Sequence, residues 1–306
     1  MSDLVTGASQ QALAVTLALG GALCYAVAAV AQQRCAARLD SGTALDARLV
    51  LRLARARGWQ LSMIAVLTGY GLHAAALAIG NLVIVEPVIP LGLLMALLLG
   101  ARTEGRRLSW SEWAAAVATV AGLAVFLVAA EPSGGSRTAP ATSLGVATTG
   151  AVLTAAVCWV VTRRVSAHHR ALPLSVAGGI AAGVTDSLTK TVAPLAGVQQ
   201  IALLGDARLW LLALAGLLAL TLQQNAYRAA GLAASLPAFV VLQPLTGSLL
   251  GMMIYHERVG GGGLRITVEV LAVLAAIWGI AKLASSVIAE LARLGAHSSS
   301  ALDPAR

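Results

Sequence analysis

Charged residues are scarce in this chain, and acidic ones are scarcer than basic ones. Only 11% of the 306 residues are Asp, Glu, Lys or Arg, whereas 58% are hydrophobic and the mean hydropathy is +0.83. A soluble domain carries about 25% charged residues to cover its surface, so this composition excludes an ordinary soluble protein. We expect an all-α integral membrane protein whose first partner is the lipid bilayer.

Cysteines and catalytic motifs are also sparse. The three cysteines, Cys24, Cys35 and Cys158, lie in or beside apolar segments, without a pairing pattern or metal-ligand spacing. No segment combines a nucleophile with an orienting base, and no glycine-rich loop has a phosphate-binding context. We therefore expect no enzyme activity, no cofactor and no redox role.

Long apolar runs are what the chain has in abundance. About 20 apolar residues cross the hydrocarbon core of a bilayer. Nine runs of this kind lie at about 11–33, 59–79, 82–101, 112–130, 143–162, 172–194, 208–226, 232–255 and 266–286. A linker rich in Pro, Gly, Ser and Thr follows the fourth run. We expect transmembrane halves at 1–135 and 143–290, and a disordered cytoplasmic tail at 291–306.

The basic residues predict the orientation. With the N-terminus outside, only Arg137, Arg208, Arg258 and Arg265 of the 21 basic residues lie outside, while Lys190 lies within a span. The remainder lie inside, which is typical of a plasma-membrane protein with an internal C-terminus. Because these charges are spread over separate loops, they do not predict nucleic-acid binding.

Segment 41–57 has leucines four residues apart and arginines on its other faces. This pattern predicts an amphipathic helix on the cytoplasmic surface, with its arginines near anionic headgroups. A solvated basic loop is the alternative. A tenth span is disfavoured, because several arginines would have to cross the bilayer.

One pattern occurs in both halves. Pro90-Leu91-Gly92 interrupts an apolar run in the first half, and Pro244-Leu245-Thr246-Gly247 interrupts one in the second. Because the two copies lie in the third and the eighth apolar runs, an odd offset, we expect the halves to have inverted topology. Proline-broken segments in repeated halves are typical of transporters with a midplane site.

Two places carry ionisable groups within predicted spans, where such groups are costly and often functional. Glu86 lies between Val85 and Pro87 and near Pro90, where missing N–H groups free carbonyl oxygens that could join its carboxylate in binding Mg²⁺, another hard cation or a proton. Asp186 and Lys190 lie four residues apart on one helix face. They form either a structural ion pair or a site in which Asp186 exchanges Lys190 for a cation.

Further polar residues extend the predicted substrate pathway. Tyr70 and His73 in the second span correspond to Gln224 and Asn225 in the seventh, and Gln243 precedes Pro244. They line a cavity or form interhelical hydrogen bonds. Glu86 and Asp186 are the candidate metal ligands.

The chain resembles the drug/metabolite transporter superfamily, in its EamA-like and NIPA-type magnesium transporter branches. The resemblance rests on Val88-Ile89-Pro90-Leu91-Gly92, on Gln224-Asn225-Ala226-Tyr227-Arg228, on residues 183–190 and on the basic first loop, and it covers about residues 15–285. It implies a helical bundle of two inverted halves, alternating access and Mg²⁺ transport. Lys190 within the sixth span departs from that pattern.

Three functions remain open. The first is a secondary transporter for Mg²⁺ or another divalent cation, and the second is a proton-coupled exporter of a small cationic metabolite or drug. The third is a membrane scaffold or lipid-interacting subunit without transport. The chain could also form a homo-oligomer.

Overall fold

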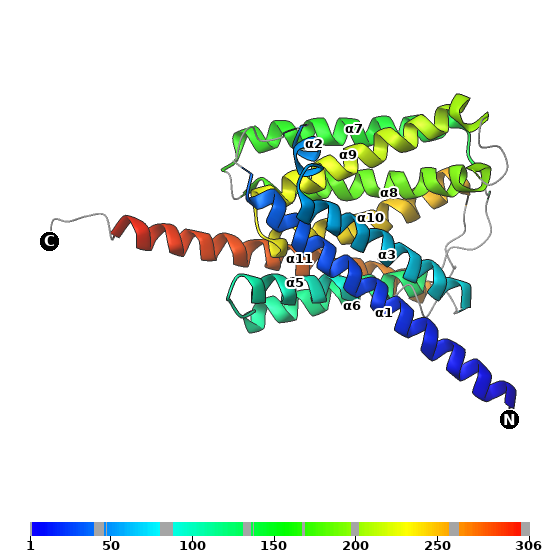
Figure 1. The fold of residues 1–306 in the computed structure, drawn as a ribbon, viewed down its shortest axis with the longest axis horizontal. Coiled ribbons are helices and arrows are strands. Elements are labelled where there is room, and N and C mark those ends of the chain that lie inside the picture. Colours follow the sequence, from blue (N-terminus) through cyan, green and yellow to red (C-terminus); the bar gives the residue numbers. More distant parts are fainter. Residues whose placement is uncertain are drawn as a thin grey trace.

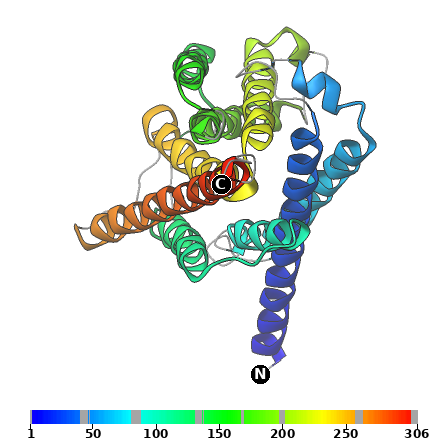
Figure 2. The same ribbon diagram turned by 90° about the vertical axis from the view of Figure 1, so that its left-hand side faces the viewer.

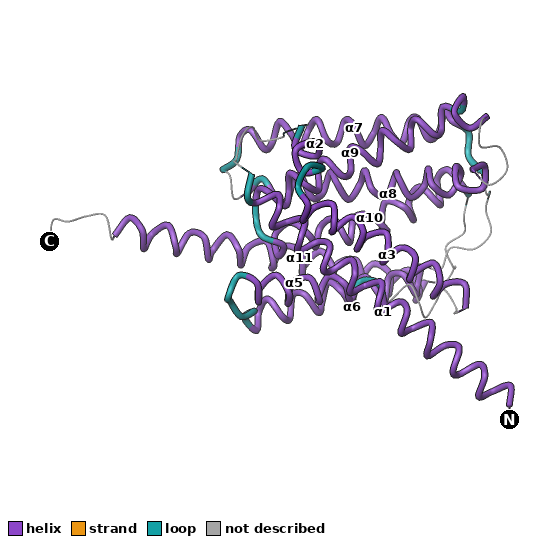
Figure 3. Tube along the Cα trace, in the orientation of Figure 1, coloured by secondary structure: helices purple, strands orange, loops and turns teal. Residues whose placement is uncertain are grey.

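A computed structural model describes residues 2–39, 46, 48–79, 88–130, 136, 138–166, 169–196, 202–256 and 263–300. Regular structure within these ranges is entirely helical, as the purple segments of Figure 3 show. The longer helices run roughly along one axis (Figure 1), and the end-on view of Figure 2 shows how they surround one another in a bundle.

The helices follow one another without a change of secondary-structure type. The first part of the chain forms α1 (Ser2–Ala37), α2 (Leu49–Leu53), α3 (Arg57–Ile79), α5 (Leu91–Thr103) and α6 (Trp110–Ala130). The second forms α7 (Ala141–Arg164), α8 (Ala171–Ala196), the short 3-10 helix η3 (Ala202–Gly205), α9 (Ala207–Ala229), α10 (Leu232–Tyr255) and α11 (Gly263–Ser300).

Seven of the described helices are long and apolar enough to cross a membrane, namely α1, α6, α7, α8, α9, α10 and α11. This agrees with an all-helical, multi-pass membrane protein. Helix α3 coincides with the predicted span at 59–79, and the 13-residue α5 covers the second part of the one at 82–101. Residues 82–87 lie outside the described residues, so a count of nine spans stays a prediction.

Small residues let the helices approach closely. Ala14, Ala18 and Ala22 are fully buried and Ala26 is 1% exposed, so one face of α1 is an alanine stripe. Helix α1 packs on α3 and α5, while α8 packs on α7, α9 and α10. Close packing of small side chains is the main source of helix association in lipid, where apolar surface gains nothing from leaving water.

Helices α6 and α11 form another tightly packed pair. A Cβ added at Gly122 of α6 would lie 2.5 Å from the carbonyl oxygen of Ala272 on α11. A Cβ at Gly279 of α11 would lie 2.5 Å from the carbonyl oxygen of Ala115 on α6. Each helix therefore presents a glycine to the backbone of the other.

Asp206 begins α9. Its carboxylate accepts hydrogen bonds from the backbone N–H and the guanidinium of Arg208, and these bonds lower the pKa of Asp206 to about 2. A charged N-cap of this kind satisfies N–H groups that the first helical turn leaves unpaired.

The end of the chain differs from expectation. We predicted a disordered tail at 291–306, but α11 continues to Ser300 and extends beyond the bundle (Figure 1). The physical reason is local, because residues 288–295 are rich in Ala, Leu, Glu and Arg, which have high helix propensity. Residues 301–306 lie outside the described residues.

We predict that Gly122→Ala destabilises the protein, because the added methyl group would overlap the α11 backbone. Overpacking of this kind costs roughly 1–3 kcal/mol. Thermal unfolding of the purified protein in detergent would measure the loss. Gly150→Ala on α7 is the matched control, since a Cβ there meets no atom within 4 Å. Equal melting temperatures for the two variants would contradict the close α6–α11 approach.

Candidate functional site

The contact between α8 and α10 positions the candidate site. A Cβ at Gly183 of α8 would lie 2.5 Å from the carbonyl oxygen of Gln243 and 3.0 Å from the backbone nitrogen of Gly247. Only glycine permits this approach. It brings the residue before Pro244 directly against α8.

The two proline motifs differ in the structure. Pro90 is the N-cap of α5 and therefore stands at a helix start, but Pro244 lies inside a continuous α10. The expected break at Pro244 is not observed. Transmembrane helices tolerate proline where neighbouring helices and local adjustment satisfy the freed backbone groups, and α10 is packed against α8 at this point. Glu86 and Pro87 lie outside the described residues.

Asp186 and Lys190 are both engaged by α10. The Gln243 side-chain amide donates a 2.9 Å hydrogen bond to Asp186 Oδ2. One turn further along α8, Lys190 Nζ lies 4.4 Å from the ring centroid of Tyr255, a cation–π contact. The two opposite charges on α8 thus have neutral partners on the helix that contains Pro244.

Tyr255 holds the end of α10 against α8. Its side chain is fully buried, and its hydroxyl donates to the carbonyl oxygen of Ser187 and lies 2.7 Å from Thr191 Oγ1. The backbone N–H of Ser136 donates to the Tyr255 carbonyl at 2.7 Å. These bonds fix the ring over which Lys190 lies.

Two predicted pathway residues lie on α3. Tyr70 packs edge-on against Tyr25 of α1, with ring centroids 5.5 Å apart. His73 has a buried Nε2, and its backbone nitrogen and Cβ lie near Gly21 of α1. Both residues therefore lie where α3 packs on α1.

Gln224 and Asn225 lie in a second polar cluster, near the end of α9. The Gln224 amide donates a buried 2.8 Å hydrogen bond to Gln32 of α1. Asn225 Oδ1 accepts from the Asp46 backbone N–H at 2.9 Å, and Asn225 Nδ2 donates back to the Asp46 carbonyl at 3.1 Å. Both amides thus join α9 to the first part of the chain rather than to Asp186.

The Asn225 side chain uses its full hydrogen-bonding capacity. Its Nδ2 also donates to the Thr221 carbonyl at 2.8 Å, and its Oδ1 also accepts from Arg228 at 2.9 Å. Arg228 lies 3.5 Å from the Asp46 carboxylate, which also pairs with Arg52 of α2. Because both donors and both lone pairs of the Asn225 amide are occupied, Asn225 has a structural role and offers no free polar group to a cavity.

Helix α2 is the described part of the predicted amphipathic segment. Leu49 is fully buried and Leu53 is 1% exposed, and both belong to the apolar core shared by α1, α5 and α9. Arg52 and Arg55 are exposed. The described leucines therefore face the protein, and the helix is only 5 residues long.

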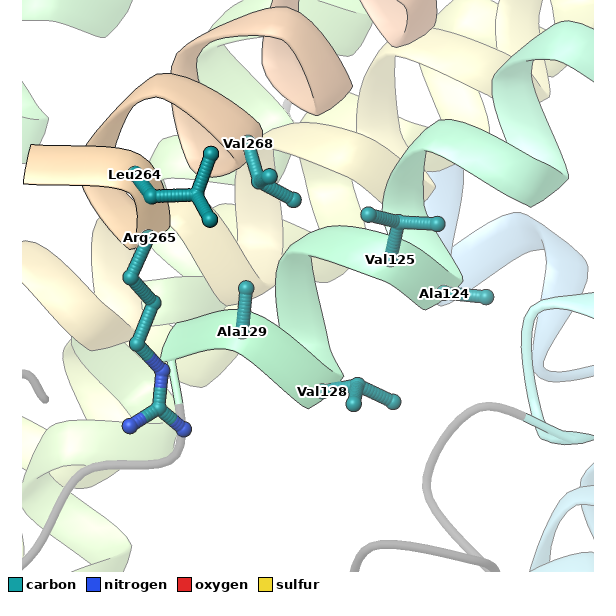
Figure 4. Close-up of a pocket in the computed structure, with 7 residues that line it drawn as sticks. All are labelled: Ala124, Val125, Val128, Ala129, Leu264, Arg265 and Val268. Atoms are coloured by element: carbon teal, nitrogen blue, oxygen red, sulfur yellow. The ribbon is translucent and has the colours of Figure 1, made fainter.

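A cavity of about 640 Å³ lies elsewhere, between α6 and α11 (Figure 4). It is lined by Ala124, Val125, Val128 and Ala129 of α6 and by Leu264, Arg265 and Val268 of α11. Arg265 supplies the only charged group of this lining. The walls are otherwise apolar, so the cavity does not suit a small polar solute.

Candidate metal ligands are not grouped within the part of the chain that the structure describes. No set of three or more His, Cys, Asp or Glu side chains lies together there. Asp186 accepts a hydrogen bond from Nε2 of Gln243, and the Lys190 ammonium group, one turn further along α8, has donors only.

Comparison with known proteins adds one relative of similar length. No family model matches the chain, and no solved structure matches it. The chain is similar to a protein of Corynebacterium glutamicum that is described as uncharacterized, with 29% identity over 255 residues, covering 80% of this chain and 86% of that protein. The similarity extends over most of both chains and brings no activity with it.

Sequence reasoning missed Asp46 and Tyr255. Asp46 is the single acidic residue of segment 41–57, and this isolation among arginines was the available signal. Tyr255 gave no signal, because an aromatic residue near a span end is typical of the membrane interface.

We predict that Asn225→Ala destabilises the protein by about 1–3 kcal/mol, because the buried backbone groups of Asp46 and Thr221 lose their partner. Unfolding in detergent, followed by tryptophan fluorescence, would measure the change. Gln223→Ala serves as control, because the hydrogen bond that Gln223 forms in the described part of the chain is to Tyr227 of its own helix. A control variant as unstable as Asn225→Ala would contradict the role given to Asn225.

Proposed function

We propose that this protein is a secondary transporter of the drug/metabolite transporter type, working by alternating access in the plasma membrane. The main support is Asp186, an exposed carboxylate within the candidate membrane span Ala171–Val192. A charged side chain at such depth is too costly to face lipid and belongs in a water-accessible cavity or substrate path.

The order of helix packing supports two related halves. Helix α1 packs on α3 and α5, as α8 packs on α9 and α10, and α6 packs on α11. The close approaches also correspond, because Gly92 of α5 meets Ala22 of α1 and Gly247 of α10 meets Gly183 of α8. The order α1, α3, α5, α6 thus has a counterpart in α8, α9, α10, α11, with α7 between them.

Helix direction supports inverted topology. Gln32 and Gln224 lie near the C-terminal ends of α1 and α9 and bond to each other, so these two helices run the same way. Helix α8 packs along α9 and comes directly before it in the chain. Helix α8 is therefore antiparallel to α9, and so also to α1 (Figure 1). The corresponding helices α1 and α8 are therefore antiparallel, as inverted repeats require.

The contacts of Asp186 favour a small organic cation, or a proton, over Mg²⁺. Mg²⁺ requires near-octahedral oxygen ligands at about 2.0–2.1 Å, whereas Asp186 is bonded by an amide N–H. Lys190, one turn away, adds a positive charge that repels a divalent ion. Mg²⁺ transport remains the second proposal, since it rests on the resemblance described above and on Glu86.

Alternating access gives the Asp186–Gln243 bond a role. Gln243 immediately precedes Pro244, where α10 lacks one backbone N–H and bends at lower cost than elsewhere. Movement of this part of α10 would release Asp186 to bind its substrate cation or a proton. The scaffold alternative leaves Asp186 only a structural role, as the partner of Lys190.

We predict that Asp186→Asn abolishes substrate flux, because the amide cannot provide the negative charge that binds a cation. Proteoliposomes loaded with a panel of organic cations and driven by a pH gradient would measure efflux. Asp206→Asn is the matched control and retains flux, since Asp206 caps α9 outside the site. Unchanged flux and unchanged ligand-induced stabilisation in Asp186→Asn and Glu86→Gln would show that the proposed site is wrong. Absence of flux in the unmodified protein would favour the scaffold.

The coupling ion is tested in the same vesicles. Efflux of an organic cation that stops when the pH gradient is collapsed supports proton exchange. Mg²⁺ uptake that survives this collapse and is lost in Glu86→Gln would instead support the magnesium proposal and overturn the first.

A further inference from the structure

Three arginines converge where α9 ends. Arg52 belongs to α2, Arg170 immediately precedes α8, and Arg228 lies in the last turn of α9. Helices α8 and α9 pack together and run in opposite directions, so the start of α8 lies beside the end of α9 (Figure 1). Asp46 is the carboxylate that contacts Arg52 and Arg228. Two of the three guanidinium groups, those of Arg52 and Arg228, thus share the Asp46 carboxylate.

Burial makes this excess of positive charge costly. The Arg228 side chain is only 6% exposed, and its nitrogen lies 3.5 Å from Asp46, which is long for a strong ion pair. Arg170 Nε is shut off from solvent and has no hydrogen-bond partner in the described part of the chain. A buried donor without an acceptor loses its hydration and gains nothing in exchange.

A phosphate group would satisfy these requirements together. Its oxygens accept several hydrogen bonds, and the planar guanidinium fork matches them in paired geometry. Arg170 begins one candidate membrane span and Arg228 ends the next, so the three arginines lie where spanning helices meet the headgroup layer. This setting admits either a lipid phosphate or a soluble one.

We propose that Arg52, Arg170 and Arg228 form a binding site for a phosphate group, in which Asp46 acts as the internal counter-ion that the phosphate displaces. The site is distinct from the one at Asp186. Thr185, next to Asp186 on α8, lies near Gly216 of α9, where an added Cβ would be 3.7 Å from Cγ2 of Thr185. Arg228 lies a further 12 residues along α9. That separation is about 18 Å at 1.5 Å per residue.

Binding is tested with the full-length purified protein and two probes. Inorganic phosphate is titrated by calorimetry in detergent, and lipid retention is measured by native mass spectrometry from nanodiscs of phosphatidylglycerol or phosphatidylcholine. Saturable phosphate binding alone identifies a soluble ligand. Selective retention of phosphatidylglycerol identifies a lipid headgroup.

The variants distinguish a specific phosphate site from a general attraction of anions to positive charge. We expect Arg170→Gln and Arg52→Gln to weaken binding by about tenfold or more, since each removes charged hydrogen bonds. Asp46→Asn strengthens binding, because it removes the competing carboxylate. Arg55→Gln is the control and leaves binding unchanged, since Arg55 is exposed on the same segment.

Two results would overturn the proposal. One is the absence of saturable binding with both probes, and the other is an equal loss in Arg55→Gln and Arg170→Gln. If Arg170→Gln does not fold, Arg52→Gln decides the matter, because the Arg52 side chain is 41% exposed and its removal leaves the core intact.

Discussion

The backbone contact between α8 and α10 is the constraint on which the candidate site depends. Gly183 lets the two helices approach until a single Cβ would collide with the carbonyl oxygen of Gln243. At this separation the Gln243 side chain reaches Asp186, and Tyr255 supplies its ring to Lys190. A bulkier residue at position 183 would separate both pairs, because they are carried by the same two helices.

Polar contacts outside that pair hold the remaining helices in register. Gln32 and Gln224 join α1 to α9, while Asp46 binds Asn225 and Arg228. Each of these bonds connects residues far apart in the chain and lies partly or wholly out of solvent. Such bonds act together with the close packing of small residues to hold the helices in a single arrangement.

The helical elements followed from the sequence, because an apolar run of about 20 residues has few alternatives in lipid. The partners within the site did not. The spacing of Asp186 and Lys190 suggested either an ion pair or a cation site, and it gave no sign that Gln243 and Tyr255 of α10 contact them. Asn225 suggested either a cavity lining or a hydrogen bond between helices, and the structure shows it bonded to Asp46 and to Thr221 and Arg228 of its own helix.

The sequence by itself determined that this protein is helical and largely apolar. It also determined that two ionisable groups, Asp186 and Lys190, lie inside an apolar run. Those properties depend on composition and on the order of residues along one helix. Only the tertiary structure decided that Pro244 stays within a continuous α10 and that Arg52, Arg170 and Arg228 converge. Both depend on how separate helices pack on one another. The spacing of side chains along a single segment carries no information about the distance between two helices.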